Sequence, residues 1–260
     1  MPAARHATEQ LSLDDALARL PKSEAYARKI LTRLQRLRPF PPASTAVVDV
    51  GAAQGRFVIG CARLGYRALG VEPWAPARET AARLAELSGV DIRILPGTAE
   101  ATGLPAEQFD LVTCGSVIEH VSDPQAAFDE VYRILKPGGV FWFCTASSRS
   151  PRQREINGFP LFGWYPDRLK RRIMRWAGTS HPHLIGHTAA PAINWFTPGK
   201  ARRMLQQAGF RHAIHDRWDL RRPAEGGAAY RLGLRVVQSS GATKLLADVL
   251  LPGCAFATTK

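Results

Sequence analysis

Residues 47–57 read VVDVGAAQGRF, an apolar run that passes into a loop with glycines at positions 51 and 55. The β-branched residues before the loop favour a buried strand, and the residues after it favour a helix. Glycines let a backbone approach a ligand closely, and the first turn of a helix offers unpaired N–H groups. The segment therefore predicts a strand, a ligand-binding loop and a helix in succession.

The same alternation of strand and helix continues along the chain. Apolar runs predict further members of one sheet, and we expect strands at 45–50, 66–72, 90–95, 109–115 and 139–144. Between them we expect helices at 51–65, 75–87 and 124–136, the last capped by Asp123. Continuous apolar runs are typical of parallel strands buried on both faces. The fold class is therefore α/β, a Rossmann-like doubly wound sheet.

The flanking segments divide the rest of the chain. Helical spacing of apolar residues over 11–38 predicts N-terminal helices, which PFPPAS at 39–44 ends. An irregular insert rich in Arg, Pro, Trp and His holds a short helix at 167–177 and precedes a helix at 197–210. Two strands are expected at 211–219 and 228–238. The predicted divisions are 1–44 (N-terminal helices), 45–145 (core), 146–196 (insert, or lid), 197–240 (end of the core) and 241–260 (tail).

Composition limits the classes of protein. With 45% apolar and 22% charged residues, the 260-residue chain is neither disordered nor a coiled coil. Its four cysteines lie far apart without a CxxC pair, which indicates neither a disulfide framework nor a zinc site. The first residues lack a signal-peptide core and no apolar run is long enough to span a membrane, so we expect a cytoplasmic protein.

Positive charge is concentrated in the second half of the chain. Lys and Arg number 35 against 22 Asp and Glu, a net charge of +13, and residues 131–260 hold 21 of the basic residues and only 6 of the acidic ones. The densest stretch runs from Arg149 to Arg222. Such a stretch suits a phosphate, a nucleic acid or an anionic lipid, or it is a solvated surface of an Arg-rich chain.

Two carboxylates narrow the type of ligand. Glu72 ends the second strand, where a carboxylate accepts both hydroxyls of a ribose. Asp49 lies just before the glycine loop, where it suits a cationic ligand and opposes a pyrophosphate. The loop also lacks the third glycine of a dinucleotide fingerprint, which weakens the alternative of a nicotinamide oxidoreductase.

Beyond this loop, four segments follow in a recognisable order: GVEPW (70–74), LPGTAEATGLP (95–105), FDLVTCGSVIEHV (109–121) and RILKPGGVFWF (133–143). Together with 47–57 they resemble the class I S-adenosylmethionine-dependent methyltransferases, in the branch with ubiquinone-type, small-molecule and glycan enzymes. The resemblance implies a seven-stranded sheet with an antiparallel last strand. It also implies S-adenosyl-L-methionine as cofactor and S-adenosyl-L-homocysteine as product.

The resemblance assigns the cofactor contacts by position. The methionine part would meet the loop after the first strand and the end of the fourth, the ribose would meet Glu72, and the adenine would lie near the turns after the second and third strands. The positions are Asp49, Gly51, Ala52, Gly55, Glu72, Pro73, Trp74, Thr98, Ala99, Cys114, Gly115 and Ser116. Two departures are Ala53, where the family has glycine, and Thr98, where it has aspartate; Glu100 is a substitute for the latter.

Histidines are the candidate bases. His120 belongs to a Glu119–His120 pair that matches the family, and it either acts as a base or holds its loop. HPHLIGH places His181, His183 and His187 in the insert, where they form a base, a substrate contact or a plain loop. No cysteine or carboxylate completes a metal set nearby, so no metal is expected. The predicted catalytic residues are His120, His183 and His187, with Asn194 as a further polar candidate.

The leading functional hypothesis is O-methylation of a small molecule or glycan. The Arg runs and the aromatic residues of the insert suit an anionic, phosphorylated acceptor, and the apolar tail suits either packing or contact with a membrane and a lipid-linked acceptor. Methylation of RNA is the second hypothesis, supported by a sequence pI near 10.3 but not by any recognisable RNA-binding module. C-methylation of a small molecule and a non-enzymatic, cofactor-binding partner protein remain alternatives.

Overall fold

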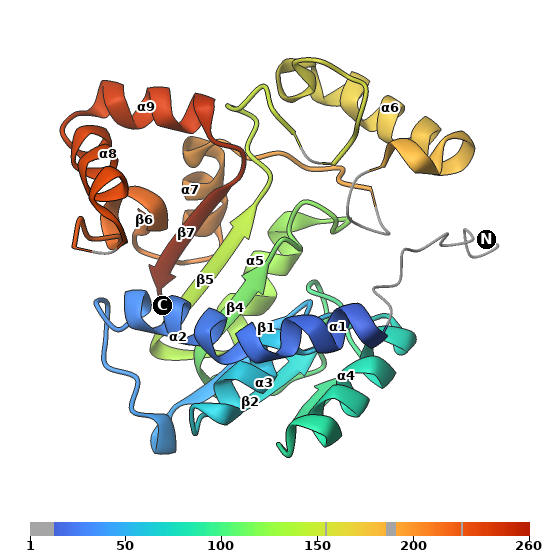
Figure 1. Cartoon of the computed structure of the whole chain (residues 1–260), viewed down its shortest axis with the longest axis vertical. Helices are drawn as coiled ribbons and strands as arrows, with labels where there is room; N and C mark the ends of the chain where they lie inside the picture. The colour runs from blue at the N-terminus through green and yellow to red at the C-terminus, as the bar shows by residue number, and fades with distance from the viewer. Residues whose placement is uncertain (1–12, 154, 186–190, 225) are drawn as a thin grey trace.

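The computed structural model describes residues 13–153, 155–185, 191–224 and 226–260, and its centre is a seven-stranded sheet (Figure 1). The strand order is β3-β2-β1-β4-β5-β7-β6. The strands are β1 (Ala46–Val50), β2 (Arg67–Val71), β3 (Arg93–Leu95), β4 (Phe109–Gly115), β5 (Leu135–Thr145), β6 (Ala213–His215) and β7 (Cys254–Thr259). The first five pair in parallel, whereas β7 runs antiparallel to both of its neighbours. The expected α/β fold, with an antiparallel last strand, is confirmed.

Helices cover both faces of the sheet. They are α1 (Leu13–Arg19), α2 (Ser23–Leu34), α3 (Arg56–Arg63), α4 (Ala75–Ser88), α5 (Pro124–Ile134), α6 (Asp167–Ser180), α7 (Pro198–Gln207), α8 (Ala228–Gln238) and α9 (Gly241–Leu250). In-register Val47, Leu111 and Val140 pack with α2 and α3 on one face. The next residue of each strand packs with α5 and α7 on the other face. Successive strand residues point to opposite faces, so both faces are apolar, as the sequence pattern predicted.

The core on the α5 side is aromatic. Phe128 of α5 is fully buried, and its ring centroid lies 5.2 Å from that of Phe143 and 6.0 Å from that of Phe141. Asp123 caps this helix by accepting hydrogen bonds from the N–H groups of Gln125 and Ala126, as expected. The cap fixes where α5 begins, and α5 in turn supports the ends of β4 and β5.

The C-terminal part differs from the sequence prediction. Residues 228–238 form helix α8 instead of a strand, and of 211–219 only β6 is extended, because residues 216–220 form a short π-helical turn, η5 (Asp216–Leu220). Alternating apolar residues in 228–238 suggested a strand. Only Leu234 of that segment is fully buried, on the face that meets Trp218 and Ala247. The segment 241–260, predicted as a tail, contains α9 and β7.

The insert forms a small packed unit of its own. Phe162, Met174 and Trp195 are buried in its cluster, which includes α6, close to the expected helix at 167–177. Lys170 is 1% exposed and its ammonium lies 4.2 Å from the centre of the Trp195 ring. At the far end of the insert, the N–H groups of Ile193 and Asn194 donate to the carbonyl of Glu119 at 2.8 and 3.0 Å. This pair of bonds joins the insert to the loop after β4.

Candidate functional site

The loop after β1 has a left-handed backbone at three residues. The φ angles are +75° at Gly51, +47° at Ala53 and +73° at Gly55. A Cβ at position 51 would lie 2.2 Å from Cγ2 of Val117, so glycine is required there. Ala53, the departure from the family glycine, adopts the backbone of a glycine at a cost of about 1–2 kcal/mol. The N–H groups of Gly51 and Ala52 donate to the carbonyl of Val71, which ties the loop to the end of β2.

Two carboxylates meet at this edge of the sheet. Glu72 accepts hydrogen bonds from the N–H groups of Ala53 at 2.9 Å and Trp74 at 3.0 Å. Asp49 is buried and accepts a 2.7 Å bond from the hydroxyl of Thr113. Burial raises the pKa of Asp49 to about 7, the Thr113 bond opposes the rise, and the charge of Glu72 adds to it. The loop after β1 therefore lies between one buried and one half-exposed acidic group.

The turn after β3 is held by its own hydrogen bonds. The Thr98 hydroxyl accepts from the N–H of Ala101 at 3.2 Å, and Thr98 remains exposed, whereas Ala99 is buried in the core. Glu100 accepts from the N–H of Ser122 at 2.9 Å and so connects this turn to the loop after β4. Glu100, the predicted substitute for the family aspartate, thus takes part in a hydrogen bond that holds the loop after β4.

The end of β4 presents one exposed polar side chain. Ser116 has a φ of +59°, which is strained for a serine, and its N–H donates to the carbonyl of Cys144 at 2.9 Å. Cys114 is fully buried in the core, and burial raises the pKa of its thiol. Of the three residues expected here, Gly115 and Ser116 lie at the edge, whereas Cys114 has its side chain in the core.

These residues fit the expected cofactor. A buried carboxylate is stabilised by a nearby positive charge. For Asp49 the described neighbours that act on it are the Thr113 hydroxyl and the Glu72 carboxylate, neither of which is cationic. The sulfonium and ammonium groups of S-adenosylmethionine would supply the missing positive charge, and Glu72 lies where a ribose would be bound.

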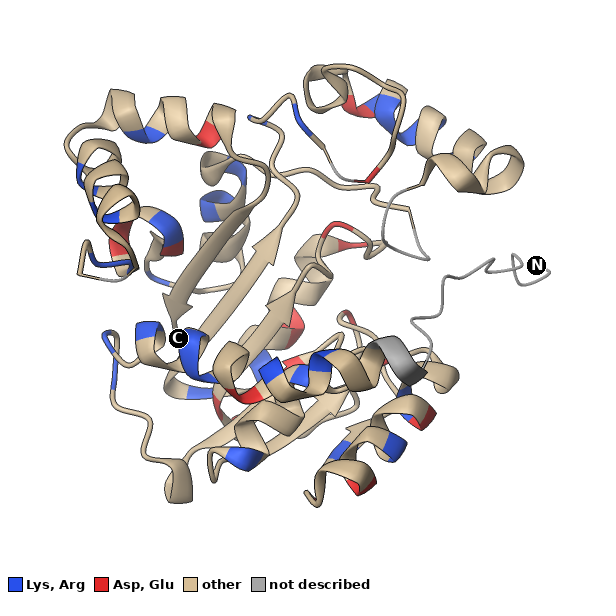
Figure 2. Cartoon of the chain, viewed as in Figure 1, with Lys and Arg blue, Asp and Glu red and all other residues tan. Residues whose placement is uncertain are grey.

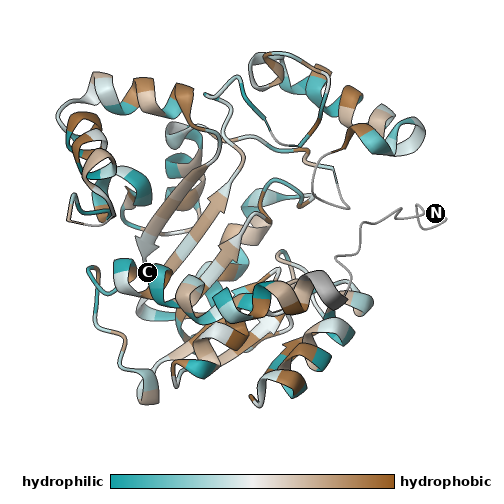
Figure 3. Ribbon diagram, in the orientation of Figure 1, coloured by the Kyte–Doolittle hydropathy of each residue, from teal (hydrophilic) through white to brown (hydrophobic). Residues whose placement is uncertain are grey.

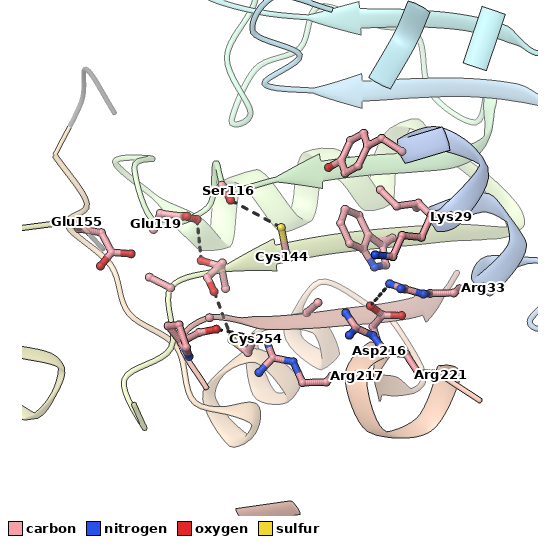
Figure 4. A pocket seen from close by; sticks show the side chains of 18 residues that line it. Lys29, Arg33, Ser116, Glu119, Cys144, Glu155, Asp216, Arg217, Arg221 and Cys254 are labelled. Atoms are coloured by element: carbon pink, nitrogen blue, oxygen red, sulfur yellow. Dashed lines mark hydrogen bonds and ion pairs between the residues drawn. The ribbon is translucent and has the colours of Figure 1, made fainter. Parts of the chain in front are cut away.

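A cavity of about 450 Å³ lies beside the carboxyl ends of β4 and β5 (Figure 4). It extends over the ends of β4 and β5 and the start of β7, between α2 and η5. Ser116 and Glu119 line the side next to β4, and Cys144 and Cys254 lie at its floor. Its size suits a small organic molecule.

Glu119 is the acidic group of the cavity that lies beside the end of β4. The side chain is 5% exposed and accepts a 2.8 Å hydrogen bond from the Thr145 hydroxyl. Burial raises its pKa to about 7, against the hydrogen bonds from its own N–H and from Thr145, which lower it, and the charge of Glu155 adds to the rise. A carboxylate with this pKa takes up a proton efficiently near neutral pH.

Two of the histidines predicted as bases lie outside the lining of this cavity. Neither His120 nor His183 is among the residues that line the cavity, and His183 is exposed. His181 stacks on Trp176 with ring centroids 4.2 Å apart, and His183 lies 5.9 Å from His181. His187 lies outside the described residues. Among the residues described, no group of three or more His, Cys, Asp or Glu is arranged to hold a metal ion.

Other predicted contacts of the insert serve its packing. Asn194 is buried and donates to the carbonyl of Val121 at 2.8 Å, so its amide holds the loop after β4. Phe162 and Trp195 are core residues of the insert, whereas Trp164 and Trp176 are exposed. Of the described arginines between 149 and 203, none lines the cavity. The insert contributes Ala146 and Glu155, which follow Thr145 at the end of β5.

Sequence reasoning missed the opposite wall of the cavity. Tyr26, Lys29 and Arg33 come from α2, and Asp216 and Arg217 come from η5. The sequence predicted the N-terminal helices but not which of their side chains face a cavity. No motif marks residues 216 and 217, because η5 was expected to be part of a strand.

A protein-family model described as a methyltransferase domain matches residues 48–143. Curated relatives named ubiquinone biosynthesis O-methyltransferase match part of the chain. The protein from Methylobacterium sp. (strain 4-46) is 33% identical over 132 residues, 50% of this chain and 53% of that protein. The Pseudomonas entomophila protein is 39% identical over 42% of this chain and 47% of its own length. The chain therefore spans about half the length of these relatives.

Solved structures share the fold over most of the chain. A sarcosine dimethylglycine methyltransferase assigned in Galdieria sulphuraria aligns with a TM-score of 0.58 and 12% identity over 92% of this chain and 86% of that one. Geranyl diphosphate C-methyltransferase from Streptomyces coelicolor aligns with a TM-score of 0.57 and 18% identity over 100% of this chain and 88% of that one. At these identities the likeness concerns the fold alone.

Proposed function

We propose that this chain, whose residues 48–143 match a methyltransferase-domain model, is a class I S-adenosylmethionine-dependent methyltransferase that methylates an oxygen atom of a small molecule bound in the cavity beside β4. The observation that carries the proposal is the position of Glu119. This carboxylate lines the cavity next to the strand end at which the family binds its cofactor, and its pKa is about 7. The names of the curated relatives support oxygen as the methylated atom.

We assign the cofactor contacts as the motifs imply. Asp49, Gly51, Ala52 and Gly55 would hold the methionine part together with Gly115, Ser116 and the backbone of Cys114. Glu72 would accept the ribose hydroxyls, and Pro73, Trp74, Thr98 and Ala99 would enclose the adenine. Bound S-adenosylmethionine supplies a methyl group that its sulfonium activates for displacement.

The side chains of this chain then have three tasks. Glu119 takes the proton of the acceptor hydroxyl on its carboxylate, which Thr145 holds in place by a hydrogen bond. The wall of α2 and the floor of β5 and β7 enclose the acceptor and exclude water. The strained backbone of Ser116 fixes the edge of β4 against the carbonyl of Cys144. Glu119 thus replaces His120, His183 and His187 as the proposed base.

The test begins with binding of the cofactor. Calorimetry with S-adenosylmethionine and S-adenosylhomocysteine should give micromolar binding to the wild type. Binding should be at least about tenfold weaker in Glu72→Ala and unchanged in Glu79→Ala, an exposed glutamate of α4. Absence of binding to either ligand in folded protein would refute the cofactor assignment.

The acceptor is identified by transfer of a deuterated methyl group. Hydroxylated aromatics, polyketides, glycans, phosphorylated sugars and a short RNA are incubated with the cofactor, and mass spectrometry detects the product. NMR then shows whether oxygen, nitrogen or carbon carries the label. Turnover on RNA, with retention that weakens as salt rises, would replace the small-molecule proposal. A label on carbon would replace O-methylation by C-methylation.

Contact with a membrane surface is a second proposal, supported by α8 and α9. Both helices contain apolar residues (Figure 3). Leu232, Leu246 and Leu250 are 64%, 58% and 58% exposed. Arg231 and Arg235 of α8 are exposed between them. No helix of the described residues is long and apolar enough to cross a bilayer. Sedimentation with anionic vesicles should remove the protein from solution, and equal recovery with and without vesicles would refute the contact.

A further inference from the structure

Basic side chains gather on the wall of the cavity that α2 and η5 form, opposite Glu119. Lys29 and Arg33 project from α2, Arg217 projects from η5, and Arg221 follows that turn (Figure 4). Lys and Arg elsewhere are spread over many helices (Figure 2), so it is the convergence of two distant segments that makes this wall unusual. Arg217 and Arg221 belong to the basic stretch from Arg149 to Arg222, whereas Lys29 and Arg33 lie far from it in the sequence.

The positive charge of this wall exceeds the negative charge. Asp216 is the carboxylate of the wall, and its Oδ2 lies 3.4 Å from Nη1 of Arg33, with side chains 1% and 8% exposed. Among the described residues, no ion pair within 4.0 Å engages Lys29, Arg217 or Arg221. Asp216 and Arg33 therefore offset each other, and three cations remain toward the cavity.

Two of these cations have buried nitrogen atoms without an acceptor. Nη1 of Arg217 and Nε of Arg221 are buried and have no hydrogen-bond partner in the part of the chain that the structure describes. Nη2 of Arg217 donates to the carbonyl of Pro252 at 3.2 Å. Burial, and next the charge of Arg221, lower the pKa of Arg217. Buried donors of this kind are costly unless a ligand supplies an acceptor, and arginine forks match phosphate oxygens.

We propose that Arg217, Arg221 and Lys29 form a subsite for a phosphate group of the methyl acceptor. A phosphate fits better than a carboxylate because three cations balance a dianion. The identification of the bound molecule as the acceptor rests on the proposed function, whereas the phosphate site does not. Between Glu119 at the end of β4 and η5 at the end of β6 lie three strand spacings, about 14 Å. The acceptor would thus carry its phosphate roughly 10–15 Å from the methylated atom, a distance set by that spacing.

The test uses inorganic phosphate and phenyl phosphate as probes, with benzoate as the carboxylate counterpart. Titration calorimetry is run on the wild type and on the double variant Arg217→Gln/Arg221→Gln. Lys29→Ala changes the exposed cation that α2 contributes to the same wall. Arg202→Gln is the matched control, because Arg202 is an exposed arginine of α7 that does not line the cavity. Circular dichroism and S-adenosylmethionine binding report whether each variant is folded.

We expect phenyl phosphate to bind the wild type more tightly than benzoate. The double variant should bind it at least tenfold more weakly, Lys29→Ala severalfold more weakly, and Arg202→Gln as the wild type does. Equal phosphate affinity in the wild type and the folded variants, or stronger binding of benzoate, would overturn the proposal. Loss of phosphate binding with unchanged S-adenosylmethionine binding isolates this subsite, whereas failure of the wild type to bind S-adenosylmethionine overturns the methyltransferase assignment alone.

Discussion

The carboxyl group of Glu119 should make the free energy of unfolding fall as the pH rises from about 4.5 to about 7. Its pKa is raised from 4.5 to about 7 in the folded protein. Between these values the folded state retains a proton that the unfolded state releases, so each rise in pH favours unfolding. At 1.36 kcal/mol for each pH unit, the full effect is about 3 kcal/mol, and it is constant above pH 7.

Glu119→Gln should remove this dependence. The amide has the shape of the carboxyl group, keeps an oxygen for the Thr145 hydroxyl and does not ionise. We therefore expect the variant to gain about 3 kcal/mol relative to the wild type between pH 4.5 and pH 8. Asp49 also has a pKa of about 7, but it is present in both proteins and cancels in the difference. Urea denaturation at several pH values, followed by circular dichroism, measures the effect.

Glu79→Gln, on the exposed side of α4, is the control and should show no such difference. Parallel stability curves for the wild type and Glu119→Gln would refute the buried, proton-holding state of this side chain. Turnover provides a second readout once an acceptor is known. The wild-type rate should rise with pH around pH 7 as the carboxylate forms, and Glu119→Gln should lose most of the rate at all pH values.

Three further predictions concern the cofactor loop and the core. In the wild type, affinity for S-adenosylmethionine should rise about tenfold from pH 6 to pH 8 as Asp49 ionises, and in Asp49→Asn, calorimetry should find affinity nearly independent of pH. Ala53→Gly should raise the free energy of unfolding by about 0.5–1 kcal/mol because it relieves the left-handed backbone, and a loss of stability in urea denaturation would contradict this reason. Phe128→Ala should lower the free energy of unfolding by about 3–5 kcal/mol because it empties a fully buried site, and a thermal midpoint within a degree of the wild type would disprove that packing.

The sequence predicted the first half of the sheet because each signal there is local. Buried parallel strands are short apolar runs, so β1 and β4 were placed within a residue of their observed starts. β5 begins four residues earlier than expected, at Leu135, since the turn residues after α5 also pair with the sheet. The glycine loop and Glu72 could be found because they occupy fixed positions after two of these strands.

The structure of the C-terminal part could not be predicted from local sequence signals. β7 has the sequence CAFATT, in which Phe256 is the only large residue, and it forms a strand between β5 and β6. Apolar residues alternate in α8, which suggested a strand, but the segment forms a helix whose Leu234 packs against Trp218 and Ala247 of α9. In both segments the partners are distant in sequence, so local propensity does not decide the structure.

In the candidate site, too, some residues follow from local motifs and others depend on contacts between distant segments. Asp49 and Glu72 were found from motifs, but the cavity depends on how α2 and η5 approach each other across the sheet. The Glu119–His120 pair is a motif of the sequence, and the prediction named His120 of that pair as the base. Only burial, which depends on the folded structure, brings the pKa of Glu119 to about 7.

The position of β7 also has a consequence for protein synthesis. The strand fits between β5 and β6, although 109 residues separate Cys254 from Thr145 at the end of β5. A ribosome needs about 5–20 s to add a segment of this length. During that time a nascent chain presents β5 as an open sheet edge, the kind of surface on which chains associate. Truncation or premature termination before Cys254 should therefore leave the edge of β5 open and cause aggregation in the cell.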